Sequence, residues 1–322
     1  MLSESTRRAW LTTAGSLAAT PLLAAQVQTS PEPLKADFKY CLNTSTIRIA
    51  EGQWGKSRGI VESIGIASKA GFAAVEPWIA ELDEYTKGGG TLPDLKKRFA
   101  DAGLAVPNAI GFAEWIVEDA ERRKKGLEQA KRDMDKVLAI GGSQIAAPPT
   151  GATGGASRRD DPKYTEPVAP LVAADRYKAL LEIGKKIGVR PIVEVWGFSR
   201  SLSRLGETML VAMECGRDGG AVLPDVYHLY KGGSDFDGLK LLGARGIGIF
   251  HVNDYPKLDR GKIVDADRVY PGDGIAPLAD IVASLKEMNY LGYLSLELFN
   301  STYWKQDPLE VARTGLKKLK AI

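Results

Sequence analysis

The feature that most constrains the fold is a regular alternation of short apolar runs with longer amphipathic, charged runs. The alternation begins at Asp37 and continues to the C-terminus. Short, continuously apolar runs are typical of strands that are buried on both faces. The predicted strands span residues 38–42, 73–78, 104–110, 144–147, 191–196, 221–223, 247–252 and 293–298.

Helical patterns lie between these strands, most clearly at 127–140, 173–187, 205–215, 275–288 and 309–319. Several end in glycine shortly before the next strand, as in KAGF at 69–72 and KIGV at 186–189, which fits a left-handed helix cap. Eight units over about 285 residues give roughly 35 residues each, the size of a βα repeat in a (β/α)8 barrel. We therefore expect an α/β fold, a single TIM barrel over residues 37–322. A doubly wound open sheet is the alternative, but no phosphate-binding glycine fingerprint follows the first predicted strand.

The N-terminal segment has the pattern of an export signal. Arg7 and Arg8 precede a weakly apolar stretch that ends in the small residues Ala24 and Ala25. This pattern resembles a bacterial twin-arginine signal, and it is too short and too polar for a membrane span. We expect a signal peptide at 1–25, a linker at 26–36, passage through the twin-arginine export machinery, and a periplasmic or secreted protein without a stable membrane anchor. An ordinary disordered terminus is the alternative.

Charge and composition exclude several classes of protein. Lys and Arg number 43 against 40 Asp and Glu, and a net charge of +3 is too small for a nucleic-acid clamp. The two cysteines, Cys41 and Cys215, cannot build a disulfide scaffold. With two histidines, His228 and His251, a histidine-rich site for several metals is excluded. We therefore expect a small-molecule partner and no nucleic acid, and a homo-oligomer is compatible with the sequence.

Four consecutive predicted strands end in an ionisable residue. These are Glu194 in PIVEVW, Asp225 in AVLPDVYH, His251 in IGIFHVND and Glu297 in YLSLELFN. A buried carboxylate must be paired, hydrogen-bonded or bound to a metal. In a parallel barrel all strand C-termini open on one face, so the four side chains should converge there. Three carboxylates and one imidazole favour Mn²⁺, Mg²⁺ or Co²⁺ over a thiolate-type zinc site. A structural salt bridge is the alternative for each residue taken singly.

At these residues the sequence resembles the xylose isomerase-like TIM barrels, the sugar phosphate isomerase/epimerase superfamily, and within it the inosose isomerase/dehydratase and ketose 3-epimerase branches. The resemblance runs from Phe38 to the C-terminus. It is carried by Glu194, Asp225-x-x-His228, His251-Val-Asn-Asp254, Glu297 and the string Arg268-x-x-Pro271-Gly272-x-Gly274. The resemblance implies that Glu194, Asp225, His251 and Glu297 bind one divalent metal ion. Mn²⁺ is the first expectation, with Mg²⁺, Co²⁺ or Zn²⁺ as alternatives. The resemblance also implies that His228 and Arg268 contact substrate oxygens.

Aromatic and polar residues near the strand ends are further candidates for substrate binding. The tryptophans that follow strands are Trp54, Trp78, Trp115 and Trp196. Flat aromatic faces suit the C–H faces of sugar or cyclitol rings, although packing at the rim is the alternative for each. Glu76 at the end of the second strand and Asn108 in the third are the polar candidates.

This residue set fits proton abstraction next to a carbonyl. A divalent ion that chelates the carbonyl oxygen and a neighbouring hydroxyl stabilises the enediolate that forms. Glu194 and Glu297 could then flank the substrate, one removing a proton and the other returning it. We expect an isomerase or epimerase of a keto-sugar or keto-cyclitol. The alternatives are a lyase or dehydratase acting on an inosose or 3-keto-glycoside at the same site, and an exported sugar-binding barrel without catalysis.

Overall fold

The computed structural model describes residues 38–152, 167–216 and 219–322. The chain divides into two units, Met1–Leu34 and Lys35–Ile322, and all the described residues belong to the second. The predicted signal peptide (1–25) and linker (26–36) lie outside the described residues.

The strands are β1 (Lys39–Asn43), β2 (Ala74–Glu76), β3 (Gln144–Ala147), β4 (Arg190–Glu194), β5 (Val222–Leu223), β6 (Phe250–Val252) and β7 (Tyr293–Leu296). The helices are α1 (Ile60–Ala70), α2 (Ile79–Lys87), α3 (Leu92–Asp101), α4 (Ala120–Ala139), α5 (Pro170–Ile187), α6 (Leu205–Glu214), α7 (Val226–Gly232), α8 (Leu239–Leu242), α9 (Leu278–Glu287) and α10 (Pro308–Leu319). Among the described helices, none is both long and apolar enough to cross a bilayer.

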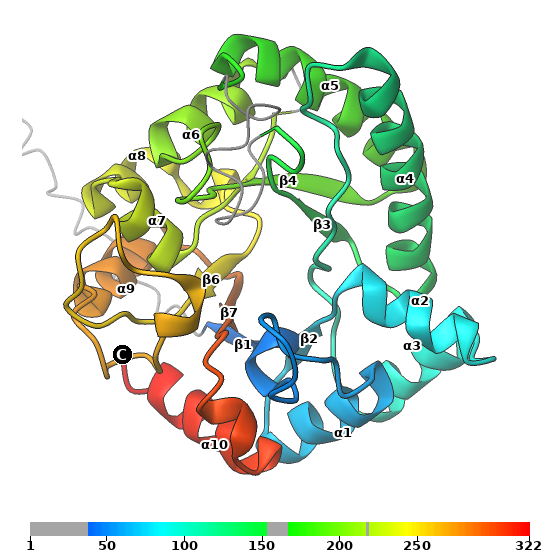
Figure 1. Ribbon diagram of the computed structural model, residues 1–322, viewed down its shortest axis with the longest axis vertical. Helices are drawn as coiled ribbons and strands as arrows, with labels where there is room; N and C mark the ends of the chain where they lie inside the picture. The colour runs from blue at the N-terminus through cyan, green and yellow to red at the C-terminus, as the bar shows by residue number, and fades with distance from the viewer. Residues whose placement is uncertain (1–37, 153–166, 217–218) are drawn as a thin grey trace, which may run out of the picture. The chain divides into compact units, whose positions relative to one another are not determined.

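The strands close into a parallel barrel. One run of neighbours is β2-β1-β7-β6 and the other is β3-β4-β5, and every pairing between strands is parallel. Bridges from Val222 to Ile247 and from Asp225 to His251 join β5 to β6. The segment 105–110 closes the ring. It bridges to Ala74 and Trp78, in and just after β2, and to Ile145 of β3. The predicted TIM barrel is confirmed, and in Figure 1 the helices surround the strands.

The third predicted strand, 104–110, is not a continuous strand. Its residues make separate bridges, from Ala105 to Ala74 and from Ala109 to Ile145. The cause is Pro107, which lies between them and has no N–H to donate to a ladder. The segment still fills the third position of the barrel wall, so the prediction of eight units holds for position but not for regular structure.

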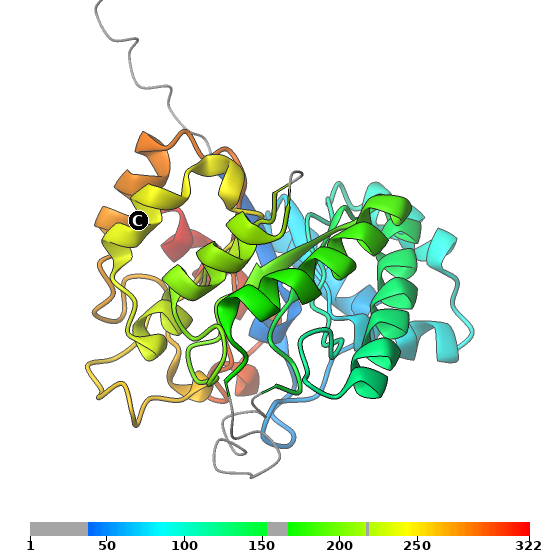
Figure 2. The same ribbon diagram turned by 90° about the horizontal axis from the view of Figure 1, so that it is seen from above.

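The helices cover the outside of the strands, as the turned view in Figure 2 also shows. Gly71 ends α1 and Gly188 ends α5, both in the left-handed conformation with φ of 93° and 92°. Those two predicted glycine caps are confirmed. Helix α4 begins seven residues before the predicted start at 127, because Asp119 caps it by accepting from the backbone N–H of Arg122.

Because the strands are parallel, their C-terminal ends lie at one end of the barrel. Glu76 is the last residue of β2 and Glu194 the last of β4. Asp225 caps α7 directly after β5, His251 lies within β6, and Glu297 immediately follows β7. The fold thus brings the ionisable strand ends to the same end of the barrel.

Candidate active site

A pocket of about 250 Å³ opens at this end of the barrel. Its aromatic lining comprises Trp54, Trp78, Phe112, Trp196, Phe198 and Phe299, with Ile110 beside them. Its polar lining comprises Glu194, His228, Asp265, Arg268 and Glu297. A ligand here would meet flat apolar faces and a small set of charged groups, which is the usual composition of a small-molecule site.

Three side chains beside this pocket converge closely enough to hold a metal ion. One ligand atom each from Asp225, His251 and Glu297 lies within 4.8 Å of the others, and all three residues are buried. His251 Nδ1 lies 3.1 Å from Glu297 Oε2 and 3.8 Å from Asp225 Oδ2. We call these three residues the cradle.

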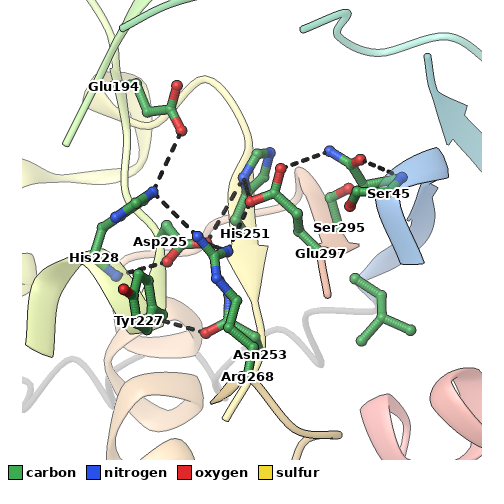
Figure 3. A network of polar contacts seen from close by, with 12 residues as sticks. Ser45, Glu194, Asp225, Tyr227, His228, His251, Asn253, Arg268, Ser295 and Glu297 are labelled. Carbon is green, nitrogen blue, oxygen red and sulfur yellow. Dashed lines mark hydrogen bonds and ion pairs between the residues drawn. The ribbon is translucent and has the colours of Figure 1, made fainter. Parts of the chain in front are cut away.

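Arg268 reaches into the cradle. Its Nη1 donates to Asp225 Oδ2 at 3.0 Å and to Glu297 Oε2 at 2.8 Å. Its Nη2 donates to Asp265 Oδ1 at 2.6 Å. The guanidinium is 1% exposed, so these charge-assisted hydrogen bonds offset the cost of its burial (Figure 3).

Glu194, the fourth predicted metal ligand, lines the pocket and is not part of the cradle. Its Oε1 is 4.0 Å from His228 Nε2. Burial raises the pKa of Glu194 well above its ordinary value, and the negative charge of Glu297 raises it further. Burial would also raise the pKa of Glu297, but His251 and Arg268 outweigh it and lower that pKa below its ordinary value. The pKa values of these two pocket-lining carboxyl groups are therefore shifted in opposite directions.

The two histidines have opposite surroundings. Gly197 donates its backbone N–H to His228 Nδ1 at 3.3 Å, and Arg268 Nη2 lies 3.2 Å from His228 Nε2. Burial and the Arg268 charge lower the pKa of His228 well below 6.5. Burial would lower the pKa of His251 as well, but Glu76 and Glu297 raise it well above that value.

Three predicted substrate contacts do not line the pocket. Glu76 and Asn108 are fully buried and bonded to each other, with Asn108 Nδ2 2.6 Å from Glu76 Oε1. Trp115 is 1% exposed, donates from Nε1 to the carbonyl of Pro148 and packs its ring on Tyr177 in the core. Their contact with substrate stays a prediction, whereas the predicted Trp78 and Trp196 do line the pocket.

Three residues of the site were absent from the predicted set. Asn43 donates to Glu297 Oε1 at 3.0 Å, Asn253 donates to Asp225 Oδ2 at 2.8 Å, and Asp265 pairs with Arg268. Asn253 lies in the string HVND and Asp265 three residues before Arg268, so a search around the quoted motifs could have found them. Asn43 follows the first strand with no local signal beyond its polarity.

The Pro-Gly-x-Gly string is fixed to the end of β6. The Asp254 carboxylate accepts from the backbone N–H groups of Gly272 and Gly274 at 3.0 Å and of Ala276 at 2.9 Å. A Cβ at Gly274 would lie 2.2 Å from the carbonyl oxygen of Tyr255, so this position requires glycine. Asp254 also pairs through its backbone with Val269, which places the neighbouring Arg268.

The donor set suits a hard divalent cation. Three buried carboxylates, those of Asp225, Asp265 and Glu297, pair with the guanidinium of Arg268. Oxygen donors with one imidazole are the ligands that Mn²⁺, Mg²⁺ and zinc accept, and a divalent charge would balance the remaining negative charge. The residues therefore fit one divalent ion at the cradle.

Comparison with known proteins agrees with this fold. A family model described as xylose isomerase-like TIM barrel matches residues 64–322. An inosose isomerase from Halalkalibacterium halodurans is 31% identical over 282 residues, covering 86% of this chain and 94% of that protein. A 3-dehydroshikimate dehydratase from Pseudomonas aeruginosa is 24% identical over 266 residues, covering 80% of this chain and 39% of that longer protein.

Solved structures share the fold. An IolI protein with a bound zinc atom superposes with a TM-score of 0.77 at 21% identity, covering 88% of this chain and 97% of that chain. A 3-keto-D-glucoside 4-epimerase from E. coli superposes with a TM-score of 0.68 at 19% identity, covering 88% of this chain and all of that one (100%).

Proposed function

Because the chain belongs to the xylose isomerase-like TIM barrel family, we propose that it is a divalent-metal-dependent isomerase or epimerase of a keto-sugar or keto-cyclitol. The relatives are isomerases, dehydratases and epimerases, and the chain is a sugar isomerase/epimerase-like enzyme. The observation that carries the proposal is the cradle of Asp225, His251 and Glu297 beside the pocket, with Glu194 facing the same pocket.

Asp225, His251 and Glu297 would hold the metal ion, and Glu194 would complete the set. When bound, such an ion supplies a positive charge that stabilises the negative charge developing on substrate oxygens. Mn²⁺ is our first expectation from the oxygen-rich donor set, with Mg²⁺, Co²⁺ and Zn²⁺ as alternatives.

Proton transfer would belong to the two carboxyl groups that line the pocket. Glu297 lines the pocket as a carboxylate and would accept a proton from the carbon next to the carbonyl. Glu194, whose pKa burial raises, is suited to hold and return one. Return to the opposite face of the same carbon gives epimerisation, and return to the neighbouring carbon gives isomerisation.

The remaining lining would bind and orient the substrate. Neutral His228 and the guanidinium of Arg268 would contact substrate oxygens. The faces of Trp78 and Trp196 suit the C–H faces of a sugar or cyclitol ring. The apolar lining also excludes water from the reacting atoms, which strengthens the interactions of the charged groups.

The test combines elemental analysis with isotope exchange. Purified full-length protein is stripped of metal, reloaded with Mn²⁺, and incubated in heavy water with keto-sugars, inososes and 3-keto-glycosides. We expect deuterium at the carbon next to the carbonyl of a substrate, present with metal and absent without it. Failure of the metal-loaded protein to exchange any of these compounds would contradict the proposal.

A lyase or dehydratase is the second candidate, and the similarity to a 3-dehydroshikimate dehydratase favours it. The first proton abstraction is shared, but a leaving group on the next carbon then departs. Mass spectrometry of the products separates the two functions, because elimination lowers the mass of the substrate while epimerisation and isomerisation preserve it.

Export by the twin-arginine route remains part of the proposal and rests on Arg7 and Arg8 with the weakly apolar stretch that follows them. Replacing both by lysine should retain the protein in the cytoplasm, whereas the unchanged chain should be recovered from the periplasm or medium.

A further inference from the structure

Glu76 is a buried charged residue that the proposed chemistry does not use. It ends β2, is fully buried and does not line the pocket. Both of its oxygens are occupied: Asn43 Nδ2 (2.9 Å) and Ser295 Oγ (2.7 Å) donate to Oε2, while Asn108 Nδ2 (2.6 Å) and His251 Nε2 (3.0 Å) contact Oε1. Four contacts fill the acceptor capacity of a carboxylate, so Glu76 has no oxygen left for a substrate.

The partners of Glu76 come from separate parts of the barrel wall. Asn43 ends β1, Ser295 lies in β7 and Asn108 lies in the third segment. Strand register places Asn43 opposite Glu76, and His251 opposite Ser295. The carboxylate is therefore held by side chains from several positions of the barrel wall, which fix its place beside His251.

What Glu76 contacts is the far side of the His251 ring. Nε2 faces Glu76, while Nδ1 faces Glu297 and Asp225. A neutral imidazole carries one proton and one lone pair. With the proton on Nε2 and donated to Glu76, the lone pair lies on Nδ1 and points into the cradle. The other tautomer would direct an N–H at the cradle and a lone pair at the Glu76 carboxylate, and a flipped ring would place C–H groups at both positions.

We propose that Glu76 is a positioning residue that fixes the orientation and tautomer of His251, so that Nδ1 is the metal-binding nitrogen. A carboxylate behind a metal-binding imidazole also makes that ligand more basic. The role rests on the metal site of the proposed function. It deepens that proposal by assigning Glu76 to the metal's affinity and not to substrate contact.

The central experiment compares Glu76→Gln with Ser295→Ala. Both variants disturb the same buried carboxylate cluster, but only the first removes the anion behind His251. Metal-free full-length proteins are titrated with Co²⁺, and the dissociation constant and visible absorption spectrum are recorded. We expect Glu76→Gln to weaken Co²⁺ binding by about 10- to 100-fold and to alter the spectrum. Ser295→Ala should retain the spectrum, with a smaller change in affinity. Equal affinities for wild type and Glu76→Gln would overturn the proposal.

A measurement on the wild type does not depend on how the variants fold. Because the chain has two histidines, NMR of nitrogen-labelled histidine in the Zn²⁺-loaded protein shows two rings. We expect one ring with a protonated Nε2 and a metal-bound Nδ1, and its signals should be those missing from His251→Gln. Binding through Nε2 would overturn the role of Glu76 while leaving the metal site intact. Absence of any metal binding by the wild type would instead overturn the proposed function, and this inference with it.

Discussion

His251 and His228 are both buried at the same end of the barrel, yet their surroundings are opposite. His251 has a carboxylate at each ring nitrogen, Glu76 on one side and Glu297 on the other. His228 has a hydrogen-bond donor at each, the Gly197 N–H and Arg268. A neutral imidazole can accept from one of these donors, and protonated imidazole from neither. Burial alone would lower the pKa of both rings, so the neighbouring charges decide which histidine can be charged.

The comparison teaches a division of labour within one site. His251, which lies among carboxylates, is part of the cation site, because the same negative charge that favours imidazolium favours a metal ion. His228, which lies among hydrogen-bond donors and has a lowered pKa, is suited in its neutral form to hydrogen-bond a substrate oxygen. Arg268 lies between them, since it contacts both Glu297 and His228 (Figure 3).

The largest effect should come from removing the anion on the cradle side of His251. Glu297→Gln should lower turnover by at least about 10²-fold, because a neutral amide cannot accept the substrate proton. Deuterium uptake by the substrate identified in the exchange screen measures it. Glu81→Gln is the control: it also removes a buried carboxylate, but one bonded to Thr44 and Ser57. Near-normal exchange by Glu297→Gln would assign proton abstraction to another group.

Removing the guanidinium of Arg268, which contacts groups around both histidines, should lower the stability of the metal-free protein. Arg268→Gln removes the cation shared by the buried carboxylates of Asp225, Asp265 and Glu297, which should lower the free energy of unfolding of the metal-free protein by about 3–5 kcal/mol. Urea unfolding measures the loss, and added metal ion should recover part of it by binding the folded state. The exposed Arg98–Asp94 pair provides the control, since solvent screens it and Arg98→Gln should change the free energy of unfolding far less. Equal losses would show that the buried cation has no special role.

Exchanging one histidine at a time tests the division directly. His251→Gln should weaken Co²⁺ binding by more than about 100-fold, because it removes a ligand and not merely a supporting contact. His228→Gln should keep the metal and raise the KM of the substrate. Elemental analysis after dialysis, together with steady-state kinetics, distinguishes the two. Equal metal loss in both variants would break the comparison.

The smallest effect should be seen in the pH dependence of stability without metal. His228 has a lowered pKa, so its contribution is present above about 6.5 and is lost as the pH falls below that value. His251 has a raised pKa, so its contribution is present below about 6.5 and is lost as the pH rises through the folded-state pKa. In urea unfolding, the deficit of His228→Gln should shrink toward acid and that of His251→Gln toward alkali. Parallel deficits at all pH values would contradict this assignment.

The sequence predicted the fold well because apolar strand runs and glycine caps are local signals. It predicted where the ionisable residues gather because parallel strands share one C-terminal end. Pro107 shows a limit: the apolar pattern continues through it, but the hydrogen-bond ladder does not.

Side-chain contacts between residues on different strands could not be predicted from the sequence. Nothing local distinguishes Glu76, bonded on all sides, from Glu194, which faces the pocket, because both simply end an apolar strand. Trp115 follows the third segment as Trp196 follows β4, yet only Trp196 reaches the pocket. The difference lies in tertiary contacts, because Trp115 donates to the carbonyl of Pro148 and packs against the ring of Tyr177.

The hold of Asp254 on the glycine-rich loop has a consequence for redesign. His251 and Arg268 are mounted on one continuous piece of chain, since Asp254 ties β6 to the residues around 269–276. Altering that loop to admit another substrate would therefore shift the arginine and the imidazole together. Anyone transplanting this chemistry to another barrel would need to move the span from 251 to 276 as a single cassette.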